Sequence, residues 1–358
     1  MSMNTTQLKT LPLKADKILS TIKDSSTVGC KGESENVRHN SVSFEASEYC
    51  HLLLDNMQDM DIIGFEHETR SLIEVLARKD RANVLIVGES GVGKTSLIAN
   101  IVMLVRNKKI PASLASMHPF ELDVISLSQG VSYKGEIEDR FKDVVKKVLN
   151  HQQPILIIDN FHRIEDKQSI LNGILPIIKK LLSENQIQFI CTSTIDGYTK
   201  DIEHDKELTS YFEKITVEEP TESVAVEILK SKCAKYEDFH KISISEDVPV
   251  EIVRLAKRYI PERNLPSSAL DLLDRSMASI KIENELADIS DKDVSVNKTD
   301  KLEKATIRDV VSKMTGIPMG NIQSEEREKL SNAEAALHKR VVGQNHAVKS
   351  VCIKKVRT

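Results

Sequence analysis

The chain has 358 residues, enough for two compact domains, and its net charge of −4 reflects 50 Lys and Arg against 54 Asp and Glu residues. This balance gives no overall basic field and so does not favour nucleic-acid binding. The five cysteines include no C-x-x-C pair, which argues against a zinc site or a disulfide framework. No apolar run reaches the length of a signal or a membrane span, so we expect a soluble, cytoplasmic protein without a membrane partner.

The N-terminal part of the chain is polar and precedes the first regular patterns. We expect a mobile tail over residues 1–45, with one amphipathic stretch at Leu13–Ile22. A helical pattern follows from Ala46 to Met60, a break at residues 61–65 ends it, and an amphipathic helix is predicted over Glu66–Arg78. The α/β domain is expected to span residues 46–220.

The most informative stretch lies just downstream. Val84–Val87 is typical of a strand buried on both faces, and residues 88–95 match G-x-x-x-x-G-K-[ST] in full before a helical run. Such a loop closes its backbone N–H groups around phosphates at a positive helix end, while its Lys and Ser/Thr reach the β/γ-phosphates and Mg²⁺. A Gly-rich turn without a ligand is the alternative, and the strand and helix flanking the loop weigh against it. We predict a nucleoside triphosphate site formed by Gly88, Glu89, Ser90, Gly91, Val92, Gly93, Lys94, Thr95 and Ser96, with Thr95 also a metal ligand.

Strand and helix patterns then alternate. Buried strands are predicted at Phe120–Leu127, Pro154–Asp159, Ile187–Thr192 and Lys214–Val217, with helices at Glu136–Leu149 and Ile170–Leu182 between them. This alternation indicates an α/β fold with a parallel sheet flanked by helices and right-handed crossovers.

The pattern changes near residue 220. Residues 221–282 hold three predicted helices and no buried strand, so a small all-α domain is expected there, followed by a charged linker over residues 283–304. Residues 305–358 are expected to form a helical connector, with helices at Thr306–Thr315 and Ser324–Arg340. Residues 341–348 repeat the pattern of residues 62–69, as if a second copy of the module began there and were truncated.

Two residues after the 154–158 strand bear on hydrolysis. An Asp at the end of such a strand, beside a phosphate loop, orients Mg²⁺, which makes Asp159 the second predicted metal ligand. The alternative is a strand that merely ends in a turn. The next residue is Asn160, where a hydrolysing ATPase of this kind uses a carboxylate; an amide holds a water but cannot take its proton.

Over residues 49–351 the chain resembles the first AAA+ module of the Clp family of ATP-dependent protein unfoldases and chaperones (ClpA, ClpB, ClpC and ClpV). The resemblance rests on the phosphate loop and on residues 61–64, 130–136, 192–198, 258–263, 315–318 and 338–344. It implies an AAA+ P-loop NTPase fold with a helical lid, ATP and Mg²⁺ as cofactors, protein substrates, and a hexamer of identical or mixed Clp-type subunits.

The resemblance also implies roles for single residues. Ile62 and Ile63 would pack on adenine, Thr194 would sense the γ-phosphate, and Tyr133 would be the pore-loop aromatic that grips an extended polypeptide. Without the family match, Tyr133 is an ordinary surface residue and Thr194 one more strand Thr.

Several positions depart from the family pattern. Asn160 replaces a Glu, Ser210 and Tyr211 stand where a pair of arginine fingers is usual, and Phe65 replaces an Arg. A general base is worth about 10²- to 10⁴-fold and an arginine finger about 10³- to 10⁵-fold in rate. We therefore expect a module that binds ATP and hydrolyses it poorly. A non-catalytic, nucleotide-locked scaffold or regulator of active Clp-type ATPases is the alternative, and a DNA-acting AAA+ protein fits less well.

Overall fold

The computed structural model describes residues 49–54, 62–131, 133–166, 168–289 and 300–317, and the chain divides into two compact units, residues 1–224 and 225–358. The predicted tail, the helix at Ser324–Arg340 and the second copy at residues 341–348 lie outside the described residues.

The first unit is built on one six-stranded sheet in the order β1-β3-β4-β5-β2-β6. Every pair in it is parallel except the edge pair of β1 with β3. This order places β5 between the strand that precedes the phosphate loop, β2, and the strand that ends before Asp159, β4. The strands are β1 (Cys50–Leu52), β2 (Val84–Val87), β3 (His118–Leu122), β4 (Pro154–Ile158), β5 (Gln188–Ser193) and β6 (Glu213–Thr216).

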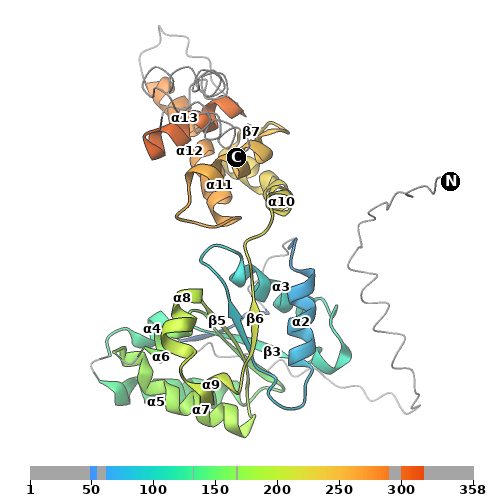
Figure 1. Cartoon of the computed structure of the whole chain (residues 1–358), viewed down its shortest axis with the longest axis vertical. Coiled ribbons are helices and arrows are strands. Elements are labelled where there is room, and N and C mark those ends of the chain that lie inside the picture. Colours follow the sequence, from blue (N-terminus) through green and yellow to red (C-terminus); the bar gives the residue numbers. More distant parts are fainter. Residues whose placement is uncertain (1–48, 55–61, 132, 167, 290–299, 318–358) are drawn as a thin grey trace, which may run out of the picture. The chain divides into compact units, whose positions relative to one another are not determined.

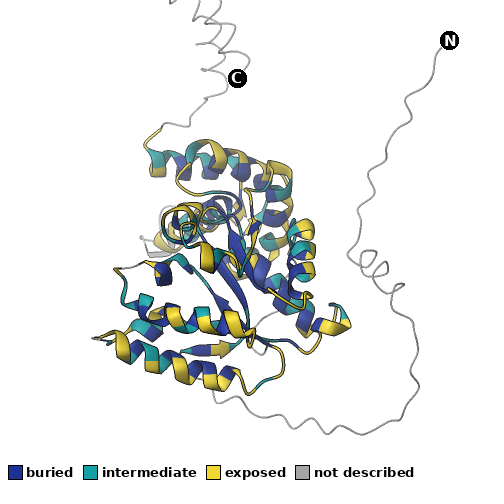
Figure 2. Cartoon of the chain, turned by 60° about the horizontal axis from the view of Figure 1, so that its bottom comes forward, coloured by how far each residue is buried: buried dark blue, intermediate teal, exposed yellow. Residues whose placement is uncertain are grey.

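Helices cover both faces of this sheet and bury it (Figures 1 and 2). On one face, α2 (Glu66–Leu76) and α3 (Lys94–Arg106) contribute to a core with Ile155 and Ile157 of β4. On the other face, α4 (Val124–Ser128), α5 (Lys134–Val148) and α7 (Leu175–Glu184) contribute to a core with Leu156 and Ile158. The alternation along β4 thus assigns odd-numbered side chains to the α3 face. Short helical segments complete the unit: Ala112–Leu114, α6 (His162–Glu165), Ile170–Ile174, α8 (Ile195–Gly197), Tyr198–Ile202 and α9 (Lys206–Thr209).

Two local predictions in this unit are wrong. Cys50–Leu52 is a strand, not part of a helix over residues 46–60, because it pairs with β3 and buries Cys50 completely opposite Leu122. The strand predicted over Phe120–Leu127 ends at Leu122, and residues 124–128 are helical. Asp123 causes the switch, since its side chain accepts hydrogen bonds from the backbone N–H groups of Ile125 and Ser126 and caps α4.

The second unit is mainly helical, with α10 (Glu222–His240) continuing into it from the first. Its other helices are α11 (Val248–Tyr259), α12 (Ser267–Ile289) and α13 (Lys304–Thr315). It is not entirely helical, because β7 (Ser243–Ile244) pairs with β8 (Lys301–Leu302). The predicted linker over residues 283–304 therefore includes the end of α12 and all of β8. None of the described helices is long and apolar enough to cross a membrane.

The predicted α/β fold with a mainly parallel sheet flanked by helices is confirmed by this arrangement. The G-x-x-x-x-G-K-[ST] loop follows an inner strand of the sheet, and the second unit is mainly helical.

Candidate functional site

The loop after β2 forms a tight turn that requires glycine at two positions. Gly91 and Gly93 have φ of 88° and 104°, a region that residues with a Cβ rarely enter. A Cβ on Gly93 would also lie 2.7 Å from Cζ of Phe65, and one on Gly88 would lie 2.4 Å from the carbonyl oxygen of Val217. Side chains are therefore excluded at these glycines, and the loop presents only its backbone there.

Lys94 is held against the loop that precedes it. Its Nζ donates to the carbonyl oxygens of Gly88 and Glu89, each at 2.8 Å. Burial lowers the pKa of Lys94, while the nearby Asp159 and Glu89 act in the opposite direction. The ammonium group thus lies between the loop and the end of β4, where it would meet a bound anion.

Helix α3 begins at Lys94 and places Thr95 and Ser96 in its first turn. The first N–H groups of a helix have no partners within it, and the helix dipole adds partial positive charge at this end. The glycine-lined backbone, the Lys94 ammonium and the helix start together fit a polyphosphate.

The ends of β4 and β5 provide the groups opposite the loop. Oδ1 of Asp159 accepts a hydrogen bond from Oγ1 of Thr192, and Oδ2 accepts one at 3.1 Å from Nδ2 of Asn160. The backbone N–H of Asn160 donates to Thr192 Oγ1 at 2.9 Å. The side-chain amide of Asn160 is therefore directed at Asp159.

The Thr95 hydroxyl and the Asp159 carboxylate are the oxygen ligands that Mg²⁺ prefers. Among the described residues there is no group of three or more His, Cys, Asp and Glu side chains that could hold a metal ion. This donor set fits an ion that keeps several waters and takes its remaining ligands from substrate phosphates, as Mg²⁺ does in nucleotide sites.

Thr194 and His162 lie at the same edge of the sheet. Thr194 caps α8, its Oγ1 accepting from the N–H of Gly197 at 3.0 Å. Nδ1 of His162 lies 3.3 Å from Oγ of Ser193, and its ring packs on Gly197 so closely that a Cβ there would clash. Burial, followed by the charge of Arg163, lowers the pKa of His162. These effects favour the neutral imidazole, which joins α6 to the loop that carries Thr194.

The sequence pattern did not indicate His162 or Glu121. Glu121 lines a cavity of about 290 Å³ together with His51, residues 122–125, Asp159, Asn160 and Arg163. The sequence contained a signal for it: a charged residue inside an apolar run that was predicted to be a buried strand. Phe65, noted as a departure from the family, is the residue that packs on Gly93.

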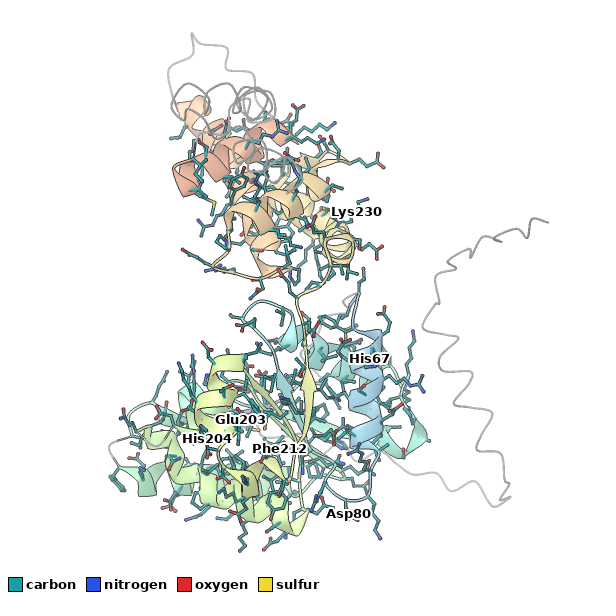
Figure 3. All side chains as sticks on the ribbon, viewed as in Figure 1. His67, Asp80, Glu203, His204, Phe212 and Lys230 are labelled. Atoms are coloured by element: carbon teal, nitrogen blue, oxygen red, sulfur yellow. The ribbon has the colours of Figure 1, made fainter. Side chains whose placement is uncertain are left out.

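The other predicted site residues lie in different surroundings, and their roles remain predictions. Ile62 and Ile63 are half-buried, and Ile62 packs on the α2–α3 core. Tyr133 is 65% exposed and directly precedes α5. Ser210 and Tyr211 follow α9, and Oγ of Ser210 donates to the carbonyl oxygen of Glu207. Phe212, labelled in Figure 3, packs against Phe161 with ring centroids 5.8 Å apart.

Comparisons with known proteins identify the families of both units. Residues 84–216 match the ATPase family associated with various cellular activities (AAA), and residues 221–318 match the AAA lid domain. The ATP-binding subunits ClpC of the ATP-dependent Clp protease from Staphylococcus epidermidis and Staphylococcus aureus (strain USA300) are each 31% identical over 339 residues. These alignments cover 81% of this chain and 42% and 41% of the two relatives.

Solved structures of Hsp104 are similar as well. The Saccharomyces cerevisiae Hsp104–ADP complex gives a TM-score of 0.73 at 33% identity, covering 86% of this chain and 51% of that one. A closed-state structure of Hsp104 with ATPγS and casein gives a TM-score of 0.69 at 33% identity. It covers 87% of this chain and 52% of the Hsp104 chain. The chain thus spans about two fifths of the ClpC relatives and about half of the Hsp104 chains. It belongs to the Clp family of AAA+ proteins.

Proposed function

We propose that this chain binds ATP with Mg²⁺ in the loop after β2 and acts in a ring of Clp-type subunits on protein substrates, with its own hydrolysis impaired. The observation that carries the proposal is the pairing of a complete phosphate cradle with an amide at position 160. The Lys94 ammonium and the start of α3 would interact with the charge that the ATP phosphates already carry before hydrolysis. Binding of ATP therefore needs no general base.

The residues of the site would have separate roles in binding and hydrolysis. The loop N–H groups and Lys94 hold the phosphates, and Thr95 and Asp159 hold the metal, which offsets charge on the β- and γ-oxygens when bound. Asn160 keeps a water in place through its amide but takes no proton from it. Since a general base is typically worth about 10²- to 10⁴-fold, the lack of a carboxylate at position 160 slows turnover by up to that factor.

The protein substrate is supported by one feature of this chain and by its relatives, and slow hydrolysis in a ring is supported by a second feature. Tyr133 is exposed at the start of α5, where an aromatic ring is available to an extended polypeptide. The segment after α9, including Ser210 and Tyr211, carries no guanidinium group to offer a neighbour's nucleotide. Hsp104 has been solved with casein, and the ClpC relatives are subunits of an ATP-dependent protease.

A second candidate is a non-catalytic scaffold that stays loaded with ATP and organises active Clp-type subunits. The absence of both Glu at position 160 and Arg at positions 210 and 211 favours it, because a chain without these groups helps neither its own site nor a neighbour's.

Calorimetry with ATP and Mg²⁺, using Lys94→Ala as the matched control, tests the binding step. We expect saturable binding by the wild type, a loss of at least about tenfold in affinity for the variant, and turnover near background. Absence of binding by the wild type would contradict both candidates. Fast steady-state turnover abolished by Asn160→Ala would contradict impaired hydrolysis.

Sizing the chain with and without ATP, followed by an unfolding assay on a protein substrate, separates the two candidates. Assembly with ATP and no unfolding selects the scaffold, whereas ATP-dependent unfolding selects the ring that acts on substrates.

A further inference from the structure

A carboxylate lies next to the candidate site on the neighbouring strand. Glu121 of β3 pairs in register with Ile157 of β4, two residues before Asp159. Phe120 and Leu122 face the α5 side of the sheet, so the alternation of β3 directs Glu121 to the opposite face, which Ile157 shares. Glu121 thus lies on the side of the sheet that carries α3 and the phosphate loop, close to the carboxyl ends of the strands.

Glu121 shares its cavity with Asp159 and Asn160. Its side chain is half-buried and forms no hydrogen bond or ion pair with any residue in the described part of the chain. The Glu121 carboxylate therefore has no hydrogen-bond donor among the described residues, and its oxygens are available to a water in this cavity.

The other acidic groups of the cavity are already engaged. Asp123 accepts hydrogen bonds from two backbone N–H groups and from the hydroxyl of Ser126, which lowers its pKa. Asp159 accepts from Thr192 and Asn160 and is the predicted metal ligand. Glu121 is the carboxylate of this cavity whose oxygens are not occupied by other described residues.

We propose that Glu121 supplies, from β3, the carboxylate that position 160 lacks, and acts as the general base for the slow ATP hydrolysis of this chain. This rests on the proposed binding of ATP at the loop after β2. A water held by Asn160 attacks the γ-phosphorus and forms the new P–O bond. The bond from that phosphorus to the β–γ bridging oxygen breaks, and its electron pair leaves with ADP. One proton of the water passes to Glu121 and then to solvent, leaving ADP and phosphate.

The first test is single-turnover hydrolysis of ATP with Mg²⁺ by an excess of the whole chain. We expect Glu121→Gln to lower the rate at least about tenfold without weakening ATP binding. The matched control is Asp123→Asn, which removes the same charge from the same cavity while Asn still caps α4. It should stay within about threefold of the wild type, and thermal unfolding of each variant checks the fold.

A second pair of variants separates catalysis from structure. Asn160→Glu restores a carboxylate at the family position, so adding Glu121→Gln to it should cost much less than in the wild type. A purely structural role of Glu121 would lower both rates alike and overturn the proposal. So would an unchanged rate in Glu121→Gln, or wild-type hydrolysis equal to that of Lys94→Ala. None of these results touches ATP binding, whose absence would be seen in calorimetry alone.

Discussion

Asn160 adopts φ of 55°, a left-handed conformation that Asn tolerates better than most residues. There its amide donates to Asp159, where a Glu would place a second negative charge. The hydrogen bond from the Asn160 amide thus takes the place of a like-charge contact beside Asp159. In the proposed function, the amide leaves Asp159 to hold the cation but provides no group that accepts a proton from water. Retention of the nucleotide and slow turnover would then both follow from Asn at position 160.

Phe65 and Gly93 form a contact that a Gly93→Ala variant tests. The added methyl group meets both a backbone φ of 104° and the Phe65 ring at 2.7 Å. We expect a loss of about 1 to 3 kcal/mol in unfolding free energy, which corresponds to several degrees in Tm. Gly130→Ala is the matched control, since φ there is 69° but nothing lies within 4 Å of the new Cβ.

The double variant Gly93→Ala/Phe65→Leu checks the ring contact itself. Because Leu lacks the Cζ atom, the two changes together should cost less than their sum by about 0.5 kcal/mol or more in a thermal-denaturation cycle. Strict additivity would mean that the backbone conformation alone sets the cost.

At the level of elements, strands and helices with strong patterns were predictable and short ones were not. Val84–Val87 and Pro154–Ile158 agree with their apolar runs because burial on both faces leaves a local signature. Cys50–Leu52 has no such signature, since a three-residue edge strand exists only through pairing with β3. The placement of Glu121 beside Asp159 follows from strand order, which no local pattern contains. Asp123, which caps α4, could have indicated the start of that helix, but it lies inside an apolar run that predicted a strand.

Cys50 is the buried residue of β1, so the reactivity of its thiol reports on whether this edge strand stays paired. Burial, with a further effect from Glu121, raises the pKa of Cys50 to about 12. Relative to 9.0, this lowers the thiolate fraction at pH 8 about a thousandfold. In a chain with its other cysteines replaced by Ala, we expect Cys50 to resist a thiol reagent until denaturant is added. Rapid labelling under native conditions would show that β1 does not remain paired.

In the second unit, Glu251 of α11 joins two helices. Its Oε1 accepts from Nη2 of Arg308 in α13 at 2.8 Å and from Nη2 of Arg254 at 2.9 Å. Burial alone would raise the pKa of Glu251, but the hydrogen bonds from the two arginines outweigh it and lower the pKa. The two arginine contacts of Glu251 therefore stabilise the folded chain fully at pH values above 4.5, the pKa of this group in the unfolded chain. This stabilisation is lost as the pH falls through the lower pKa of Glu251 in the folded chain.

Glu251→Gln tests this link. We expect it to destabilise the chain by about 1 to 3 kcal/mol at pH 7, and the difference from the wild type to shrink below pH 4.5 as Glu251 takes up a proton. Calorimetry from pH 3.5 to 7 measures both effects, with Glu246→Gln as the exposed control. A difference that stays constant with pH would contradict the ionic role.

For the whole molecule, the proposed ring makes each nucleotide site depend on two chains. In this proposal Lys94, Asp159 and Asn160 would act on the chain's own nucleotide, whereas the segment with Ser210 and Tyr211 would face a neighbour's. A chain that lacks the guanidinium group would then lower turnover in the next subunit as well. In a mixed ring it would set the rate of active partners through this segment.

A guanidinium group supplied in trans is therefore expected to raise turnover. Ser210 is exposed, so Ser210→Arg adds the group without disturbing the core. We expect faster hydrolysis only at concentrations where the chain assembles. An arginine finger is worth about 10³- to 10⁵-fold in rate, and we expect a smaller gain because position 160 remains an amide. The decisive mixture combines wild-type chains with Ser210→Arg/Lys94→Ala chains, which would donate the group but bind ATP at least about tenfold more weakly. Ser210→Lys is the control, since an ammonium does not reproduce the planar fork of Arg. Acceleration in this mixture and in no single component would place the segment after α9 at the neighbour's site, and its absence despite assembly would remove that segment from the mechanism.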